Sequence, residues 1–511
     1  MEPSAGDAAF LTAAVSRLAR LRRKRGFVPR VDGVEIHAAS ASLARRRVQE
    51  AGGSGEVLES DFFDVVPSPI YDAVIGNPPY IRYQNFSGEA RSKSRQAALR
   101  GGVSLTGLAS SWAAFVVHSA LFLKPGGRLG LVLPAELLSV NYAAPVRQFL
   151  FQKFRQVQLV LFAEQVFPEA EADVVLLLAD GYGEASTGQA IVRQTRNVSS
   201  LRTLEAGQVW TPADPSGKWT GSLVDPFVTG ALDSILHSER FVPLETWGDT
   251  TLGLVTGNNK YFAISPVRAK ELGLSASELL PLSPPGSSHL RGLSLSSALM
   301  ARLGQDGQST LLFYPKDKPS KAAAAYIEAG HLTGVDKAYK CQVRKTWYRV
   351  PLVKPADLLL TSMNADAPRL ISNEVSAYHL NSVHGVYLKT GDREIGLELL
   401  PLASLNSVTL MHAELVGRAY GGGILKLEPK EADLWAVPSK ALINERAEAL
   451  RSAKNSVSQL LREGNLIGAV ELVDLALFSD GFPLGHGQIE QVRAARKLLS
   501  GRRIARSHRG S

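Results

Sequence analysis

The stretch Val74-Ile75-Gly76-Asn77-Pro78-Pro79-Tyr80 decides the fold class of this chain. Its apolar beginning predicts a buried strand, and its two prolines end that strand because proline has no backbone N–H for a neighbouring strand. A stiff loop at the carboxyl end of a strand is where open α/β sheets bind their ligands. The side-chain oxygen of Asn77 and the carbonyl of Pro78 are two acceptors that suit one planar amino group, and Tyr80 offers a ring for stacking. The other interpretation is a turn with a buried asparagine.

Apolar runs alternate with helix-like stretches on both sides of this motif. The predicted strands are Val57–Leu58, Ala73–Ile75, Leu129–Leu133, Leu159–Phe162 and Val174–Ala179, and the predicted helices are Ala8–Leu21 and Trp112–Leu123. This rhythm predicts an α/β fold with a mostly parallel sheet covered by helices.

The 511 residues indicate several domains. Glycine, serine and threonine become frequent near residues 181–188, which predicts a boundary after a first domain of residues 1–182. A connecting segment, 183–240, leads to a mixed α and β region with long loops, 241–440. Residues 441–511 have a helical pattern and end in a basic tail.

Cysteine usage and charge exclude some classes of protein. The single cysteine, Cys341, excludes a disulfide framework, a Cys-rich zinc site and an iron–sulfur cluster, and it fits a reducing cytoplasm. No apolar run is long enough to span a membrane and no secretory signal is present, so we expect a cytoplasmic protein. The net charge is +9, but residues 493–511 carry seven basic residues and no acid, which leaves +2 for the rest. Charge therefore permits a polyanionic partner without indicating one.

Three further motifs follow successive predicted strands. Glu2–Leu11 places small residues and Gly6 before an apolar helix, which suits close approach to a nucleoside. Glu35 stands at a strand end and suits a ribose hydroxyl pair, unless it is only a solvated acid. Asp61 suits an adenine amino group while Phe62 packs on the ring; the other interpretation is a helix-capping aspartate beside core phenylalanines.

The order and spacing of these motifs resemble the gamma class of S-adenosylmethionine-dependent adenine-N6 DNA methyltransferases, typified by the Taq enzyme. Later motifs of that family are similar to Ser111–Phe115, Leu123–Leu129 and Val166–Pro168, and pieces of its target-recognition domain look like Gly253–Lys260, Arg344–Tyr348 and Gly421–Leu427. The resemblance implies a Rossmann-like catalytic domain, 1–182, a mixed α/β target-recognition domain, 241–440, and a helical tail.

The resemblance also implies the roles of the site residues. Catalysis is expected from Asn77, Pro78 and Tyr80, with the target base held between Tyr80 and Phe167. The residues expected to contact S-adenosylmethionine are Glu2, Ala5, Gly6, Glu35, Ile36, Asp61, Phe62, Asn77, Pro79 and Phe115. An adenine must leave the duplex to reach such a pocket, and direct transfer then needs neither a metal nor a covalent enzyme intermediate.

Two stretches are candidates for contact with double-stranded DNA. The first contains Arg82, Arg91, Lys93 and Arg95, and the second contains Lys340, Arg344, Lys345 and Trp347. The first follows the Asn77 loop and suits phosphates, unless it is a solvated loop. The second mixes cations with aromatic rings, which suits phosphates and base edges better than a plain exposed strand. The basic tail is either a third contact or a disordered end.

The sequence departs from the family at its start. Ala8 stands where the family often has glycine, and Met1 stands where the first strand should already be running. We therefore expect weak or no binding of S-adenosylmethionine unless upstream residues are restored. Micromolar binding in a calorimetric titration would contradict this expectation.

Two other functions fit the same motifs. Asn-Pro-Pro-Tyr also occurs in methyltransferases that act on an RNA base or a glutamine side chain, but these are usually compact, and the long second half argues against them. A catalytically silent DNA-specificity subunit fits the unusual start, but the intact Asn77 and Tyr80 argue against it. A restriction endonuclease is expected to be a separate polypeptide, because no convincing Asp…Glu-x-Lys set is evident.

Overall fold

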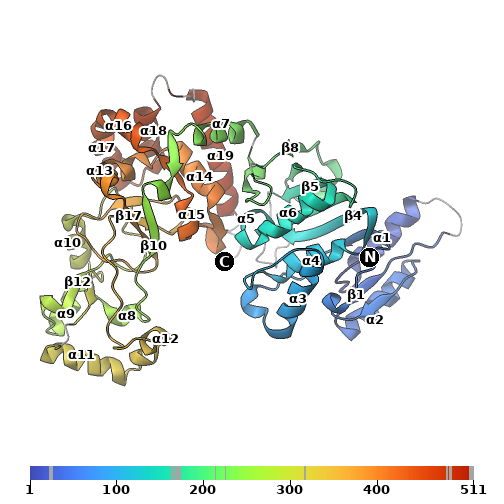
Figure 1. Cartoon of the computed structure of the whole chain (residues 1–511), viewed down its shortest axis with the longest axis horizontal. Helices are drawn as coiled ribbons and strands as arrows, with labels where there is room; N and C mark the ends of the chain where they lie inside the picture. Colours follow the sequence, from blue (N-terminus) through green and yellow to red (C-terminus); the bar gives the residue numbers. More distant parts are fainter. Residues whose placement is uncertain are drawn as a thin grey trace. The chain divides into compact units, whose positions relative to one another are not determined.

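The computed structural model describes residues 1–21, 27–162, 166, 174–212, 214–224, 226–315, 318–478, 482 and 486–505. It divides into two compact units, one from Met1 to Pro226 and one that begins at Phe227 (Figure 1). Helices and strands alternate in both units, which confirms the predicted α/β class.

The first unit is built on a six-stranded sheet. The strands of the whole unit are β1 (Gly33–Glu35), β2 (Val57–Glu59), β3 (Tyr71–Gly76), β4 (Leu123–Pro134), β5 (Phe154–Phe162), β6 (Val174–Tyr182), β7 (Ala190–Thr195) and β8 (Gln208–Trp210), of which β3 to β8 form the sheet. The sheet has the order β3-β4-β6-β5-β7-β8, and β1 and β2 form a separate parallel pair. The sheet is mixed where the sequence predicted a mostly parallel one, because β6 lies antiparallel between β4 and β5 and β8 pairs antiparallel with β7.

Met1 and Glu2 connect the β1–β2 pair to β3. The Met1 amine donates to the Ala73 carbonyl and the Met1 carbonyl accepts from the Ile75 N–H, which is the pattern of a parallel pair. On the other side Glu2 makes a parallel bridge to Gly33. The order β2, β1, Met1–Glu2, β3, β4 is therefore continuous, and the carboxyl ends of these strands lie along one edge.

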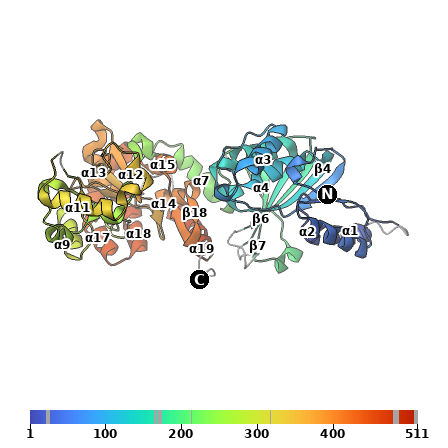
Figure 2. The same ribbon diagram turned by 90° about the horizontal axis from the view of Figure 1, so that it is seen from below.

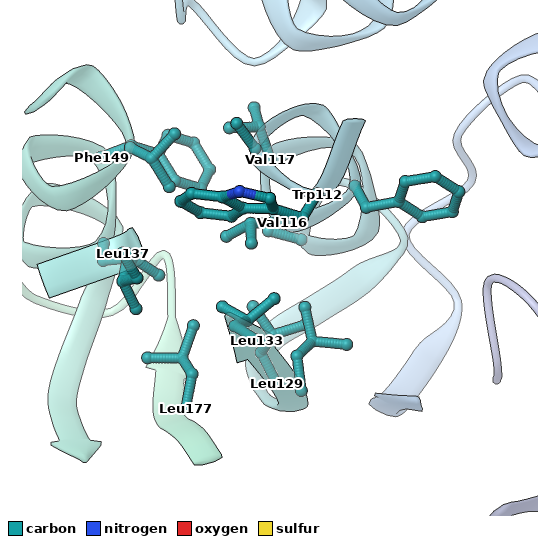
Figure 3. Packing of buried hydrophobic residues seen from close by; sticks show 14 of the residues in the cluster. Trp112, Val116, Val117, Leu129, Leu133, Leu137, Phe149 and Leu177 are labelled. Atoms are coloured by element: carbon teal, nitrogen blue, oxygen red, sulfur yellow. The ribbon is translucent and has the colours of Figure 1, made fainter. Parts of the chain in front are cut away.

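Helices cover both faces of this arrangement. They are α1 (Ala9–Leu21), α2 (Ala38–Glu50), α3 (Gly88–Arg100), α4 (Ser111–Ala120), α5 (Glu136–Ser139) and α6 (Ala144–Lys153). Figure 2 shows α3 and α4 on one side of the sheet and α1 and α2 on the other. Trp112 and Val116 of α4 pack over Leu129 and Leu133 of β4, and Val117 lies on the other side of the Trp112 ring, toward Phe149 (Figure 3). Each such buried aliphatic side chain contributes about 1.5–3 kcal/mol, so α4 is firmly fixed on the sheet.

The second unit combines small sheets with long loops, as the sequence predicted for its central part. The strands are β9 (Phe241–Pro243), β10 (Gly248–Leu252), β11 (Ala263–Ile264), β12 (Leu279–Pro281), β13 (Leu311–Phe313), β14 (Leu358–Thr361), β15 (Met363–Asn364), β16 (Leu370–Ser372), β17 (Val383–Leu388), β18 (Arg418–Tyr420), β19 (Ile424–Lys426) and β20 (Ala436–Pro438). They pair as β10-β17-β14-β16, β11-β13-β12, β15-β19-β18 and β20-β9.

Helices complete the second unit and dominate its end, again as predicted. They are α7 (Pro226–Leu236), α8 (Asn259–Phe262), α9 (Pro266–Glu271), α10 (Ser297–Gln305), α11 (Lys321–Leu332), α12 (Tyr339–Gln342), α13 (Arg393–Ala403), α14 (Ser407–Val416), α15 (Pro429–Asp433), α16 (Lys440–Glu445), α17 (Ala447–Arg462), α18 (Leu466–Leu477) and α19 (His486–Ala505). In the described part of the chain no single helix is long and apolar enough to cross a membrane. Among the helices that the structure describes, only the bent pair Thr390–Ala403 and Ser407–Val416 passes that test together.

Candidate active site

The Asn77 loop begins where β3 ends. Asn77 and Pro79 are exposed, and Pro78 is buried. The Tyr80 hydroxyl lies 2.7 Å from Asn77 Oδ1 and 2.9 Å from the Val132 carbonyl. Burial raises the pKa of Tyr80, so its hydroxyl is a neutral donor. Tyr80 therefore holds the side chain whose oxygen is the predicted acceptor of an amino group.

The glycine loop and the strand-end acid lie in contact. The Gly6 N–H donates to one carboxylate oxygen of Glu35 at 2.8 Å, and the His37 N–H donates to the other at 3.0 Å. Gly6 has a φ of +51°, a conformation that favours glycine. Glu35 is 7% exposed, whereas the neighbouring Ile36 is 59% exposed. An uncovered apolar side chain thus stands next to a fixed carboxylate.

The segment before this loop is buried. Glu2 is 2% exposed, and burial raises the pKa of its carboxyl to about 8. Within the described residues its Oε2 has no hydrogen-bond partner. Ala5 is also buried, and Ala8 has a φ of +67°, which costs an L-residue about 1–3 kcal/mol. Strained backbone and an unpaired buried carboxyl oxygen are both typical of a binding site.

The aromatic residues predicted near the cofactor pack on each other. The rings of Phe62 and Phe115 are stacked with centroids 5.3 Å apart and planes at 15°, and both side chains are buried. Asp61 accepts from the Phe63 N–H at 3.0 Å and so caps a short helix. This is the capping interpretation of Asp61, while its contact with an adenine amino group stays a prediction.

These groups fit S-adenosylmethionine. Glu35 presents two oxygens suited to ribose hydroxyls, and Ile36 presents an apolar surface suited to a purine ring. Glu2 has an unpaired carboxyl oxygen suited to an ammonium group. The donors and acceptors lie at the carboxyl ends of adjacent parallel strands, where such folds bind nucleosides.

The cations that follow the Asn77 loop belong to a helix, not to a loop. On α3, Arg91 and Arg95 donate to backbone carbonyls, and Lys93 pairs with Asp64 at 2.7 Å. Arg82 precedes this helix and is exposed. Arg91, Lys93 and Arg95 thus already have partners within the protein, and the role of all four cations toward DNA stays a prediction.

The second predicted DNA-binding group divides into packed and exposed residues. The Arg344 guanidinium donates to both carbonyls of Val255–Thr256, at 2.6 and 2.9 Å. Trp347 is half-buried and packs on the hydrophobic core of its unit. Lys340 and Lys345 are exposed. Arg344 therefore fixes the segment that resembles the opening of a target-recognition domain, and the two lysines are available to a partner.

Other predictions fall outside this site. Phe167, the predicted second wall around the target base, lies outside the described residues. No group of three or more His, Cys, Asp or Glu side chains is arranged to hold a metal in the ranges that the structure describes. Cys341 is buried, in agreement with a structural role. A cavity of about 1440 Å³ lies among α10, α13 and α17, and none of the predicted site residues lines it.

The structure adds a role for Ser111, which begins the motif Ser111–Phe115 but received no function from the sequence. Ser111, the first residue of α4, bonds to the backbone on both sides of Tyr80. The sequence does not distinguish it from the neighbouring Ser110, because the contact joins segments 30 residues apart. Only the packing of α4 on β4 brings the two together.

The fold is that of a Rossmann-like methyltransferase, with the Asn77 loop at the carboxyl end of β3. Residues 40–167 match the family described as Eco57I restriction-modification methylase, and residues 216–478 match the C-terminal domain of the type II methyltransferase M.Eco57I. The second match alone spans half of the chain. The chain therefore belongs to the Eco57I-type restriction–modification methylase family, and membership implies S-adenosylmethionine as its methyl donor.

Individual relatives extend over most of the chain. The type II methyltransferase M.XhoI of Xanthomonas vasicola is 25% identical and covers 89% of this chain and 88% of its own. M.XamI of Xanthomonas campestris pv. amaranthicola is also 25% identical, with 86% and 80% covered. The solved type IIL restriction-modification enzyme MmeI, in complex with DNA, matches 98% of this chain and 72% of its own with a TM-score of 0.59. At 13% identity that likeness shows the fold alone.

Proposed function

We propose that this chain transfers a methyl group from S-adenosylmethionine to the exocyclic N6 of an adenine flipped out of duplex DNA. It would act as the modification enzyme of a restriction–modification system whose endonuclease is a separate polypeptide. The observation that carries the proposal is the Asn77 loop, which presents an amide oxygen beside a tyrosine ring at the carboxyl end of β3.

The loop provides what an amino-group acceptor site needs. The Asn77 oxygen and the Pro78 carbonyl accept the two N–H groups of the base, which directs the nitrogen lone pair toward the methyl donor. When bound, S-adenosylmethionine supplies the electrophilic methyl group. The Tyr80 hydroxyl can keep its bond to the Val132 carbonyl when the base amino group replaces it at Asn77.

Base flipping is part of this proposal because an adenine inside a duplex cannot present its amino group to the loop. Stacking on the Tyr80 ring offsets part of the cost of removing the base, since one such stack is worth about 1–3 kcal/mol. The preference for adenine over cytosine rests on the order of the motifs, because both bases carry an exocyclic amino group. The long second unit and relatives named as type II methyltransferases support DNA over RNA or protein.

The Asn77→Ala variant tests the catalytic assignment. It should abolish methyl transfer and leave duplex binding unchanged, because it removes an acceptor and no charge. Asn141→Ala is a matched control, since Asn141 is an exposed asparagine of the same unit. Transfer of radiolabelled methyl groups measures activity and fluorescence anisotropy measures binding. Retained methylation by Asn77→Ala would refute the assigned role.

The acceptor is tested with the unmodified enzyme. Duplex DNA, structured RNA and protein extract are each offered with labelled S-adenosylmethionine, and the DNA is then digested to nucleosides. We expect label in N6-methyladenine only. Label in N4-methylcytosine would show that the acceptor base is cytosine, not adenine. Label in RNA or protein would show that the substrate is not DNA.

A further inference from the structure

Three hydrogen bonds join the start of α4 to the Asn77 loop. The Ser111 N–H donates to the Ile81 carbonyl at 3.1 Å, and the Ile81 N–H donates to Ser111 Oγ at 2.9 Å. The Ser111 hydroxyl in turn donates to the Pro79 carbonyl at 2.5 Å. Two of the three bonds therefore depend on one hydroxyl, which acts at once as donor and acceptor. Tyr80 lies between the two residues that this hydroxyl holds.

The opposite end of Tyr80 is also fixed. Its hydroxyl lies within hydrogen-bond distance of the Val132 carbonyl and of Asn77 Oδ1. The ring is thus held at its hydroxyl by β4 and at its backbone by α4. If the backbone anchor were lost, both the ring and the Asn77 oxygen would be free to shift together.

We propose that Ser111 is a positioning residue of the active site. Its hydroxyl fixes the backbone before and after Tyr80, and so places the Tyr80 ring and the Asn77 oxygen for a flipped base. Ser111 does not touch the substrate itself. This inference rests on the proposed function, because it assigns to Ser111 the geometry of that same reaction.

The surroundings of the loop separate this role from a general contribution to folding. Ser111 is 1% exposed, whereas Pro79 and Ile81 are both exposed. The Pro79 carbonyl and the Ile81 N–H are part-buried in this loop, so removal of the hydroxyl leaves them unpaired there and not in the core of the unit. The fold loses little, but the loop loses both of its side-chain anchors. A displacement of about 1 Å at reacting groups can lower a rate by about 100-fold.

The test is Ser111→Ala in the full-length enzyme, assayed by steady-state methylation of duplex DNA. We expect kcat to fall by roughly 10- to 100-fold while KM for DNA and for S-adenosylmethionine stays within about 2-fold. A duplex with 2-aminopurine at the target position reports the stacking of the flipped base. Its long-lifetime, unstacked emission should increase in the variant, which a loss of stability alone would not produce.

Two further variants serve as controls. Ser119→Ala removes the same atom from the same helix, and Ser119 is fully buried with an Oγ that has no partner among the described residues. It should keep the kcat of the unmodified enzyme. Ser111→Thr keeps a hydroxyl and should restore kcat to within about 3-fold, even if Ser111→Ala lowers the melting temperature.

The outcomes separate this inference from the proposed function. Suppose that the unmodified enzyme methylates DNA. If Ser111→Ala then has the same kcat, or if Ser119→Ala loses as much kcat as Ser111→Ala, the role of Ser111 is refuted and the proposed function stands. A rise in KM at constant kcat would equally refute positioning. If the unmodified enzyme transfers no methyl group to DNA, both are overturned.

Discussion

Replacing Arg503 by methionine should destabilise the second unit strongly. Arg503 lies on α19 and pairs with Glu414 of α14 at 2.9 Å, and the two side chains are 3% and 4% exposed. The same guanidinium donates to the carbonyls of Ala365 and Gly423. Arg503 thus joins the last described helix to the β15 and β18–β19 region.

The size of the effect follows from burial. Removing one partner of a buried pair leaves an uncompensated charge, which costs about 3–5 kcal/mol. The exposed pair Arg451–Glu398 has the same kind of partners at 2.7 Å, with 52% and 37% of the side chains exposed, and such pairs contribute about 0–1 kcal/mol. Arg451→Met is therefore the matched control. With an m-value of about 3 kcal/mol/M, we expect the urea midpoint to fall by about 1 to 1.7 M for Arg503→Met.

Urea unfolding followed by tryptophan fluorescence measures this difference. Trp435 is a local reporter, since its indole N–H donates to the Thr409 carbonyl of α14 at 2.8 Å. The double variant Arg503→Met/Glu414→Met removes both charges and should return to within about 1 kcal/mol of the unmodified protein. A midpoint shift for Arg503→Met no larger than that of Arg451→Met would show that the buried pair does not hold α19 in place.

Three further predictions concern the site and its partner. Burial raises the pKa of Glu2 from 4.5 to about 8. Below pH 4.5 Glu2 is protonated in both the folded and the unfolded chain, so it does not change stability with pH. Between pH 4.5 and 8 the unfolded chain releases the proton first, and the free energy of unfolding falls by up to about 1.4 kcal/mol per pH unit. Glu2→Gln should flatten this dependence in thermal melts from pH 5 to 8, and an unchanged slope would contradict the burial argument. Tyr80→Phe keeps the ring and should retain single-turnover methylation within about 10-fold, whereas Tyr80→Ala loses a stack worth about 1–3 kcal/mol; equal losses would contradict the stacking role. Lys345→Ala should reduce the slope of log affinity for duplex DNA against log salt concentration by about 1. Arg344→Met should instead lower the melting temperature, because the Arg344 guanidinium holds the Val255–Thr256 carbonyls. The opposite pattern would mean that Arg344 contacts DNA and Lys345 stabilises the fold.

The strand-end motifs could be predicted from the sequence because each depends on residues that are neighbours along the chain. Two prolines must end β3, and the small residues around Gly6 suit a tight loop wherever the fold places them. The resemblance implied only that Gly6 and Glu35 each contact the cofactor, and the hydrogen bond between them was not predicted. The helix predicted over Trp112–Leu123 ends at Ala120, because Leu123 already pairs with β3. Such a pairing partner lies far away in sequence and leaves no local signal.

Long-range partners also explain what sequence reasoning missed at the site. The motif around Asp61 is compatible with a ligand contact and with a helix cap, and only the position of the Phe63 N–H shows the cap. Ser111 looks like any serine at the start of a helix. Its role depends on the Pro79 carbonyl and the Ile81 N–H, which reach it only when α4 packs on the sheet.

Ion pairs within the second unit also change how the net charge of +9 relates to DNA. Most of that excess comes from the last nineteen residues. On α19, however, Arg493 pairs with Asp474 at 2.6 Å and Arg503 pairs with Glu414, so these two of the seven charges are neutralised inside the second unit. A guanidinium that is already paired releases no counterions when a phosphate approaches. The electrostatic part of duplex binding should therefore depend on exposed cations such as Lys340 and Lys345, and substituting the α19 arginines should change stability before it changes the salt dependence of binding.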